Sequence, residues 1–458
     1  MIVMKFGGSS VESAAAIERV ASIVRARVER RPVVVVSAMG KTTNRLLAIA
    51  NAAVSGERAK ALELLKSLRT YHEEHGRALV RPDDLPELEA IFDEHFSELA
   101  ELVRGLSVLG ELTPRSIDTI SSYGERLSSR VVTLAFRRFG MDSVLLDSRD
   151  VIVTDRRHTQ AAPLYSQTYE RLAAAIPPLT DAGKVVVMGG FIGATEDGVT
   201  TTLGRGGSDF SAAIVGAGIG AEEIQIWTDV DGVLTADPSI IPGARRLKIM
   251  SFAEAAELAY FGAKVLHPST VIPAIEKNIP VLVLNSRHPD FPGTRIVADA
   301  VPSANPVKSI AYKEKITVVN ITSTRMLMAH GFLRRIFEVF DKYRTAVDMI
   351  STSEVSVSLT IDDTSRLDDI CRELREIADV QAGDESAILC LVGDNIRGQC
   401  GIAARVFGAL RDVNIRMISE GASQLNLSLV VARDDLNRAV RALHEEFFQE
   451  LDPELFYE

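Results

Sequence analysis

Short, almost continuous apolar runs alternate with amphipathic stretches over the first 300 residues of the chain. The apolar runs lie at residues 2–6, 33–37, 143–146, 185–188, 224–228 and 281–284. Each run has the length of a strand, and near-continuous apolar strands are typical of a sheet that is buried on both faces. The pattern therefore predicts an α/β fold with a mainly parallel sheet sandwiched by helices.

A different pattern interrupts this alternation between about residues 45 and 115. The segment is charge-rich, has helical periodicity and contains no good strand, so we expect a helical insertion there. Farther along, four prolines gather within residues 285–306. Because proline interrupts regular structure, we expect a linker at this point and a first domain that spans residues 1–300.

The chain beyond the prolines repeats itself with a period of about 70 residues. Each repeat has the order strand, helix, strand, strand, helix, and both share the tripeptide Met-Ile-Ser. Gly331 and Gly401 begin the first helix of their repeats, and each is followed six residues later by phenylalanine. The repetition predicts two small α+β modules, at residues 310–385 and 386–458.

Composition limits what such a protein can do. The chain has 458 residues, of which 46% are hydrophobic and 25% charged, enough for several cores. Its net charge of -11 argues against nucleic acid as a partner, although a local pocket can still attract a small anion. Three cysteines without CxxC spacing favour a reducing, cytoplasmic compartment. No apolar run approaches the roughly 18 residues of a membrane span, so we expect no membrane partner.

Two glycine-rich segments stand where the backbone can approach a phosphate group. Lys5 lies at the end of the first apolar run and leads into Gly-Gly-Ser-Ser at residues 7–10. Residues 204–209, Gly-Arg-Gly-Gly-Ser-Asp, open a helical stretch and add an arginine that can grip a carboxylate with two hydrogen bonds. A tight turn before a helix would also account for the first segment. A purely structural loop seldom needs both the arginine and the acid of the second.

The other candidate motifs are less specific. An acidic loop at residues 228–232 follows an apolar run, at the end of the strand where open α/β sheets bind ligands. Residues 40–42 resemble the end of a P-loop, but Val35 stands where that motif needs its first glycine. Residues 216–220 have the glycines of a dinucleotide fingerprint but follow a helix rather than a strand. The set holds basic and acidic side chains with two phosphate-binding segments, and no Ser-His-Asp set, which favours phosphoryl transfer.

Taken in order along essentially the whole chain, these segments resemble the aspartate kinase family. The resemblance rests on residues 5–11, 122–126, 204–209, 228–232 and 261–268. It implies an amino-acid-kinase domain followed by two ACT domains. It also implies transfer of the γ-phosphoryl group of MgATP to the side-chain carboxylate of L-aspartate, the first step toward lysine, threonine and methionine. Because the second module ends the sequence, we expect a monofunctional enzyme, similar to the lysine-sensitive branch.

The resemblance also implies roles for individual residues. Lys5 and Asp209 are the expected catalytic residues, Lys5 at the transferring phosphoryl group and Asp209 as the group that orients Lys5 or the metal shell. Arg205 is expected to pair with the α-carboxylate of aspartate and Glu125 with its α-ammonium group. The expected aspartate-binding residues are Ser37, Thr43, Glu125, Phe191, Arg205 and Ser208. The expected ATP-binding residues are Lys5, Gly7, Gly8, Ser9, Thr228, Asp229 and Lys264. We expect Mg²⁺ to be held mainly by ATP, without direct side-chain ligands.

The ACT modules imply feedback inhibition. L-Lysine is the expected effector, and L-threonine stays open because Met328 and Ala329 depart from the pattern of the lysine site. The expected effector-binding residues are Met326, Phe332, Leu333, Val347, Asp348, Thr352, Ser353 and Glu354. Such sites usually lie between ACT units of two chains, so a homodimer or tetramer is expected.

Two alternatives remain at this point. Another amino-acid kinase, acting on glutamate or acetylglutamate, could share the phosphate-binding loops, although Glu125, Arg205 and the ACT modules favour the aspartate kinase. A non-catalytic amino-acid sensor built on ACT modules belongs to a different class. The presence of Lys5, Arg205 and Asp209 argues against the sensor.

Overall fold

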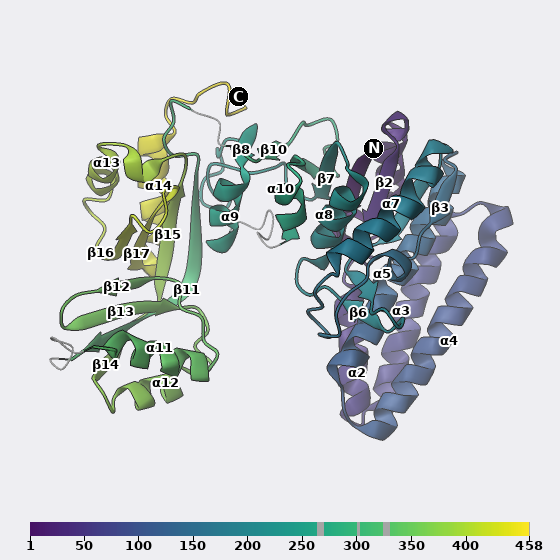
Figure 1. Ribbon diagram of the computed structural model, residues 1–458, viewed down its shortest axis with the longest axis horizontal. Helices are drawn as coiled ribbons and strands as arrows, with labels where there is room; N and C mark the ends of the chain where they lie inside the picture. The colour runs from purple at the N-terminus through teal and green to yellow at the C-terminus, as the bar shows by residue number, and fades with distance from the viewer. Residues whose placement is uncertain (263–269, 300–302, 324–329, 458) are drawn as a thin grey trace. The chain divides into compact units, whose positions relative to one another are not determined.

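The computed structural model describes residues 1–262, 270–299, 303–323 and 330–457 (Figure 1). The chain forms two compact units. The first unit comprises Met1–Val233 and Val265–Ala298, and the second comprises Leu234–Lys264 and Asp299–Glu458. The first unit therefore does not coincide with the domain expected at residues 1–300, because a segment of 31 residues within that span, Leu234–Lys264, packs with the C-terminal unit instead.

One mainly parallel sheet forms the centre of the first unit. Its strands are β1 (Ile2–Phe6), β2 (Pro32–Val36), β3 (Ser143–Leu145), β4 (Val185–Gly189), β7 (Glu223–Thr228), β9 (Val281–Asn285) and β10 (Thr294–Val297). They are ordered β3-β4-β2-β1-β7-β9-β10, and all neighbours are parallel except the antiparallel pair β9 and β10. All six predicted apolar runs lie in this sheet, which confirms the fold class. The expected linker at residues 285–306 was wrong in part, since it contains β10.

The sheet order explains where ligands can bind. β1 lies between β2 and β7, and its last residue, Phe6, stands opposite Val36 and Trp227. The loops that follow β1, β2, β4 and β7 therefore emerge at the same edge of the sheet. Every residue of β1 and β2 is buried, as expected for central strands covered on both faces.

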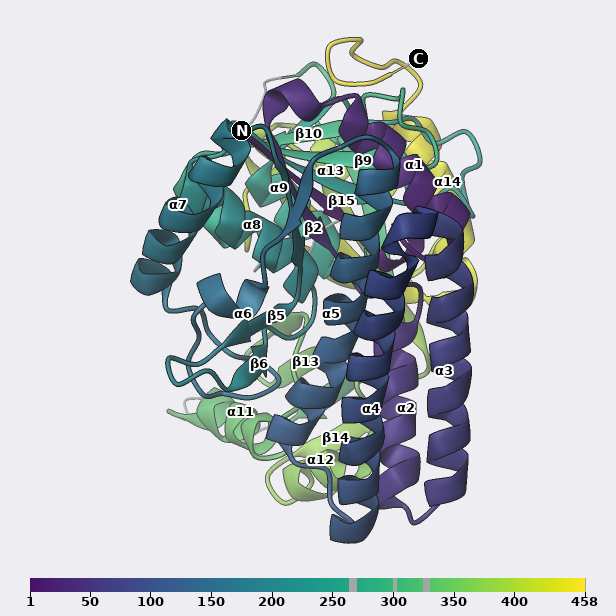
Figure 2. The ribbon, with the colours of Figure 1, turned by 90° about the vertical axis from the view of Figure 1, so that its right-hand side faces the viewer.

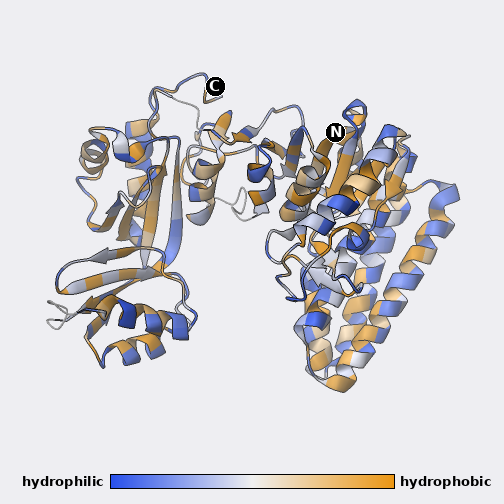
Figure 3. Cartoon of the chain, in the orientation of Figure 1, coloured by the Kyte–Doolittle hydropathy of each residue, from blue (hydrophilic) through white to orange (hydrophobic). Residues whose placement is uncertain are grey.

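Helices cover both faces of this sheet. The helices of the first unit are α1 (Ala14–Arg25), α2 (Thr42–Val54), α3 (Arg58–Leu79), α4 (Leu85–Leu109), α5 (Pro114–Arg138), α6 (Ser148–Val151), α7 (Tyr165–Asp181), α8 (Gly207–Ile219) and α10 (Ile272–Glu276). α2, α3 and α4 lie side by side, and the segment 45–115 contains no strand (Figure 2). Apolar and polar residues alternate along α3 and α4, with the apolar ones joining the main core (Figure 3).

The second unit contains a segment of mixed structure and two small sheets. Its elements are β8 (Ile249–Ser251), α9 (Phe252–Tyr260), β11 (Ser309–Thr322), α11 (Phe332–Lys342), β12 (Ile350–Thr352), β13 (Ser356–Ile361), α12 (Leu367–Leu374), β14 (Asp379–Ala382), β15 (Ser386–Val392), α13 (Ile402–Ala409), β16 (Ile415–Glu420), β17 (Asn426–Ala432) and α14 (Leu436–Phe447). Both repeats show the predicted order of strand, helix, strand, strand, helix. In the first repeat the strand β14 follows the second helix, which gives the order βαββαβ that the resemblance to ACT domains implies.

The long strand β11 joins the two small sheets. Residues 317–322 of β11 pair with β13, and residues 319–322 also pair with β14 on the other side. Residues 309–313 pair with β15 of the second repeat, and the register shifts between Lys313 and Ile316. The expected boundary between modules at 385 and 386 is therefore incomplete, because the strand beside β15 is the start of β11, which belongs to the first expected module.

No helix in the described part of the chain is both long enough and apolar enough to cross a membrane.

Candidate active site

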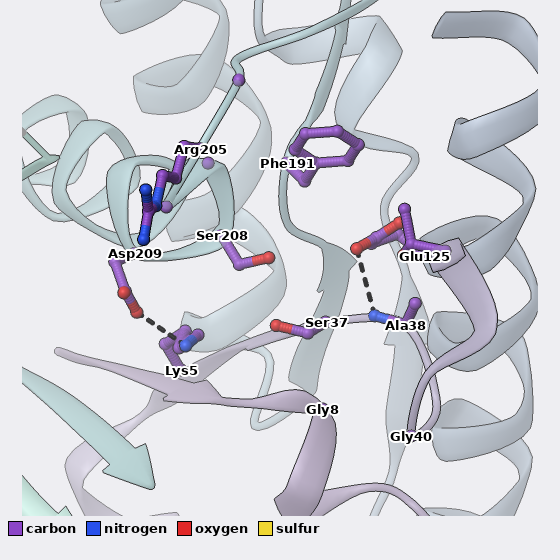
Figure 4. Close-up of a pocket in the computed structure, with 14 residues that line it drawn as sticks. Lys5, Gly8, Ser37, Ala38, Gly40, Glu125, Phe191, Arg205, Ser208 and Asp209 are labelled. Carbon is purple, nitrogen blue, oxygen red and sulfur yellow. Dashed lines mark hydrogen bonds and ion pairs between the residues drawn. The ribbon is translucent and has the colours of Figure 1, made fainter. Parts of the chain in front are cut away.

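A pocket of about 360 Å³ lies in the first unit, at the edge of the sheet where the strands end (Figure 4). It gathers all the residues expected to bind aspartate, together with Lys5, Gly8 and Asp209. Its remaining lining residues are Ala38, Gly40, Gly204, Gly206 and Gly207. Residues that are more than 200 positions apart in the sequence thus meet in one cavity.

An ion pair occupies one side of the pocket. Lys5 lies in the buried strand β1, and its Nζ is 2.6 Å from Oδ1 of Asp209 (Figure 4). Asp209 stands in the first turn of α8, where the helix dipole favours a negative charge. The side chains of Lys5 and Asp209 are only 10% and 19% exposed, so the pair holds the ammonium group at the cavity wall.

The loop that carries Arg205 depends on glycine. Gly204 and Gly206 have positive φ values of 79° and 73°, a conformation that side chains disfavour. At Gly207 a Cβ atom would lie 2.6 Å from Cδ2 of Phe191, so the loop could not pack against that ring. Arg205 is exposed, and its guanidinium pairs with none of the residues that the structure describes. The arginine is therefore available to a ligand.

Phe191 holds a strained backbone conformation beside this loop. Its φ is 65°, which costs about 1–3 kcal/mol for a residue with a side chain. Its NH donates to Oγ of Ser211 at 2.9 Å, and its carbonyl accepts from the NH of Leu203 at 2.9 Å. These bonds hold the ring at the mouth of the pocket, between the Glu125 and Arg205 sides (Figure 4).

Glu125 lies on the opposite side of the pocket, in the middle of α5. Thr113 caps this helix by accepting a hydrogen bond from the NH of Ser116, and Pro114 fits its first turn. Glu125 is 3% exposed, and Oε1 accepts a hydrogen bond from the NH of Ala38 at 3.1 Å. Oε2 is buried and has no partner among the described residues. Burial raises the pKa of Glu125 to about 8, although the Ala38 hydrogen bond lowers it.

The first glycine-rich segment forms a short 3₁₀ turn at Gly8–Ser10. The NH groups of Gly8 and Ser9 donate to no acceptor in the described part of the chain. A Cβ atom at Gly8 would lie 2.9 Å from the carbonyl oxygen of Gly40, so this position requires glycine. These free amides fit a phosphate group.

Other expected ATP-binding residues are placed differently. The NH of Gly7 donates to the carbonyl oxygen of Trp227 at 3.1 Å, so it is already used by the fold. Thr228 and Asp229 lie at the end of β7, next to β1, and do not line the pocket. Lys264 lies outside the described residues. No group of three or more His, Cys, Asp or Glu side chains suited to a metal occurs among the residues described.

Ala38 was missed by sequence reasoning, although its NH is the only hydrogen-bond donor to the Glu125 carboxylate in the described chain. The available signal was its position directly after Ser37, at the end of β2, where backbone groups of a parallel sheet become free to bind. From the sequence alone, Glu125 would be a surface residue of a helix. Its burial results from packing of α5 against the β2 and β4 ends of the sheet.

Comparisons with known proteins agree with this geometry. Residues 1–285 match the Amino acid kinase family, and residues 389–447 match an ACT domain. Aspartokinase 2 (chloroplastic) of Arabidopsis thaliana is 39% identical, with 98% of this chain and 85% of the relative covered. Lysine-sensitive aspartokinase 3 of Escherichia coli is 35% identical, covering 98% of this chain and 99% of the relative. The chain belongs to the aspartokinase family.

Solved structures of aspartokinases share the fold. E. coli aspartokinase III in complex with aspartate and ADP has a TM-score of 0.83 and 34% identity, with 98% of this chain and 100% of that chain covered. The same enzyme in complex with lysine and aspartate matches equally well, with a TM-score of 0.83. The aspartokinase resemblance found in the motifs is thereby confirmed, as is the expectation of an ATP-dependent kinase that uses MgATP as co-substrate.

Proposed function

We propose that the pocket binds L-aspartate and that the enzyme phosphorylates its side-chain carboxylate to give 4-phospho-L-aspartate. The observation that carries this proposal is the buried Oε2 of Glu125, which lacks a partner among the described residues. A buried carboxylate is costly unless a cation compensates it, and the α-ammonium group of an amino acid is such a cation. Aspartate binding would thus place a positive charge, its α-ammonium group, beside the Glu125 carboxylate.

The two sides of the pocket suit the two ends of an amino acid. Glu125 would pair with the α-ammonium group, and Arg205, on the opposite side, with the α-carboxylate. The side-chain carboxylate of aspartate would then point toward Lys5. Ser37, Thr43, Phe191 and Ser208 would line the remaining surface of the substrate site.

The reaction itself needs positioning and charge neutralisation. The attacking carboxylate is already ionised at pH 7, since an unperturbed Asp side chain has a pKa of about 3.9, so no general base is required. Lys5 and the amides of Gly8 and Ser9 would hold the transferring phosphoryl group, with Gly7 shaping the turn. Asp209 would position Lys5 through the 2.6 Å ion pair. Thr228, Asp229 and Lys264 would contact the nucleotide, and Mg²⁺ would neutralise its phosphates.

ATP-dependent formation of aspartyl hydroxamate by the purified protein tests this proposal. We expect activity with L-aspartate and none with L-glutamate or N-acetylglutamate, because a longer side chain would place its carboxylate out of line with the phosphoryl group. Activity with glutamate and not aspartate would overturn the substrate assignment. Loss of all ATP turnover, with the fold intact, would instead favour the non-catalytic sensor.

The second unit would sense L-lysine. Three observations support this: the ACT match at residues 389–447, a relative named lysine-sensitive, and a related structure that contains lysine. Leu333, Thr352, Ser353 and Glu354 lie at the start of α11 and around the end of β12. Phe332 and Val347 pack in the core of the first repeat, so they would shape the site more than touch the effector. Met326, Met328 and Ala329 lie outside the described residues.

Asp348 would receive the effector's ammonium group. Its side chain is only 3% exposed, and in this structure its Oδ1 is 2.7 Å from Nζ of Lys313. It also accepts a hydrogen bond from the hydroxyl of Tyr260 at 3.3 Å. An effector lysine would therefore compete with Lys313 for the same carboxylate. Titrating L-lysine and L-threonine into the hydroxamate assay identifies the effector: inhibition by threonine alone would keep the kinase and overturn lysine.

The two ACT repeats would also form the interface of a homodimer. Each repeat exposes a phenylalanine from its first helix, Phe337 and Phe407, and an isoleucine from an edge strand, Ile350 and Ile418. Exposed apolar side chains beside an unpaired strand edge suit pairing with a second copy of the chain. Light scattering after size exclusion should give a dimer or tetramer, and a monomer would contradict it. We expect the enzyme to act in the cytoplasm, in the pathway to lysine, threonine and methionine.

A further inference from the structure

A buried aspartate lies two helical turns from Glu125 on the same helix. Asp118 precedes Glu125 by seven residues in α5, so both side chains leave the same face of the helix. Asp118 is fully buried, yet it does not line the pocket. Its carboxylate is therefore too remote to touch a substrate bound there, and a different reason must account for its burial.

Asp118 joins α5 to two other segments. Its Oδ1 accepts hydrogen bonds from the NH of Thr159 at 3.0 Å and from Oγ1 of Thr202 at 2.5 Å. Its Oδ2 accepts from the NH of Thr159 at 3.1 Å and lies 2.7 Å from Nδ1 of His158. Backbone and hydroxyl donors thus reach Asp118, and the ring of His158 can donate to Oδ2 when its proton lies on Nδ1.

Both β6 and the segment 158–159 adjoin the loop that carries Arg205. Thr202 ends β6 (Thr200–Thr202), three residues before Arg205. Thr159 supports the loop from the other side, since a Cβ at Gly204 would lie 3.1 Å from the carbonyl oxygen of Thr159. The two segments are also joined to each other, because the NH of Ala161 donates to the carbonyl oxygen of Thr202 at 2.9 Å.

We infer that Asp118 is a positioning residue for the amino-acid substrate: it fixes the distance between the Glu125 helix and the Arg205 loop. This inference rests on the proposed roles of Glu125 and Arg205. A dipolar substrate needs its cation site and its anion site at a set separation. Only Asp118 contributes direct hydrogen bonds from α5 to both the 158–159 segment and β6 among the described residues. Weakening this link lets the arginine move relative to Glu125 without changing any group that contacts the substrate.

The substitution Asp118→Asn tests the inference, because it keeps the shape and turns one acceptor into a donor that faces other donors. We expect the KM for aspartate to rise at least about 10-fold, as for loss of a hydrogen bond to a charged group. The KM for ATP should stay within about twofold, because Lys5, Gly8 and Ser9 lie on other elements. A general loss of structure would lower kcat and leave both KM values alike, so the split between the two KM values separates positioning from stability.

Asp155→Asn is the matched control. Asp155 lies in the same loop as Thr159, and its Oδ1 accepts hydrogen bonds from the NH groups of Arg157 and Ala162 at 3.1 and 2.9 Å. It is not bonded to α5 or β6, so its substitution should leave the KM for aspartate within about twofold. An equal rise in KM for both variants would overturn the inference.

Two further variants make every outcome decisive. Thr202→Val removes one donor to Asp118 and should raise the KM for aspartate about two- to fivefold. If Asp118→Asn does not fold, an unchanged KM in Thr202→Val overturns the inference.

Arg205→Ala should raise the KM for aspartate about 10- to 150-fold, and adding Asp118→Asn to it should have little further effect. If Arg205→Ala leaves the KM unchanged, the proposed function fails. If it raises the KM while Asp118→Asn does not, only the positioning role fails.

Discussion

Two buried glutamates, one in each unit, differ in their partners: Glu254 forms an ion pair, and Glu125 forms none among the described residues. Glu254 lies in the first turn of α9 and is fully buried, and its Oε1 lies 2.6 Å from Nζ of Lys308, which is also fully buried. Its Oε2 accepts hydrogen bonds from the NH and hydroxyl of Ser251 in a capping box. Glu125 has the single hydrogen bond from Ala38, and its second oxygen has no partner among the described residues. The fold thus supplies a cation for Glu254, whereas we propose that a ligand supplies the one for Glu125.

The largest expected effect comes from breaking the compensated pair. Lys308→Met would leave the charge of Glu254 buried without a cation, which we expect to lower the free energy of unfolding of the second unit by about 3–5 kcal/mol. Thermal unfolding of the full chain measures it. The double variant Lys308→Met with Glu254→Gln should recover most of the loss. Lys342→Met is the control, because its pair with Glu373 lies at the surface, where solvent screening leaves it little effect on stability.

The next largest effect concerns catalysis at the Lys5 side of the pocket. Lys5→Ala would remove the charge that stabilises the transferring phosphoryl group, and we expect kcat to fall about 10²- to 10³-fold. The KM for aspartate should change little, since Glu125 and Arg205 remain. Steady-state kinetics in both substrates measures the split, and an unchanged kcat would contradict the assignment of Lys5.

Glu125→Gln should weaken substrate binding and yet stabilise the protein. We expect the KM for aspartate to rise about 10- to 150-fold, because a charged partner of the ammonium group is lost. The folded state holds the proton of Glu125 up to a pKa of about 8, above its ordinary pKa of 4.5, so wild-type stability falls as pH rises from 4.5 to 8.

The variant does not titrate, so its advantage in melting temperature should be larger at pH 8.5 than at pH 5.5. Each kcal/mol corresponds to about 2–4 °C for a unit of this size. Differential scanning calorimetry at the two pH values measures it. A variant less stable than wild type at pH 8.5 would show that Glu125 is compensated within the fold, as Glu254 is.

The smallest effect on stability is expected at a third, partly exposed cluster, formed by Lys313, Asp348 and Asp362. Nζ of Lys313 lies 2.7 Å from the carboxylates of both Asp348 and Asp362, and its side chain is 22% exposed. Lys313→Met should lower the free energy of unfolding by less than Lys308→Met, because Lys313 and Asp362 are partly exposed and screened by water and salt, although Asp348 is buried. The concentration of L-lysine that halves the activity should fall severalfold, since the internal competitor for Asp348 is gone. An unchanged or higher concentration would show that lysine does not use this carboxylate.

Sequence patterns predicted the elements better than their partners. The apolar runs indicated the strands of the parallel sheet because a strand buried on both faces must be apolar along its whole length. They could not show that β11 serves both small sheets, because its two halves have similar patterns and pair with strands far apart in the sequence. Nor could they assign residues 234–264 to the second unit, since that depends on long-range packing.

The candidate site shows the same division. The chain itself indicated the residues that we propose to carry the chemistry: the glycines that a tight backbone requires, the lysine at a strand end and the arginine between left-handed glycines. Only the tertiary structure decided which charges are compensated. A helical glutamate is ordinary in sequence, but packing of α5 against the sheet buries Glu125 without an ion-pair partner among the described residues, whereas Lys308 reaches Glu254 from 54 residues away. Burial and pairing depend on contacts between distant segments, and no local pattern encodes them.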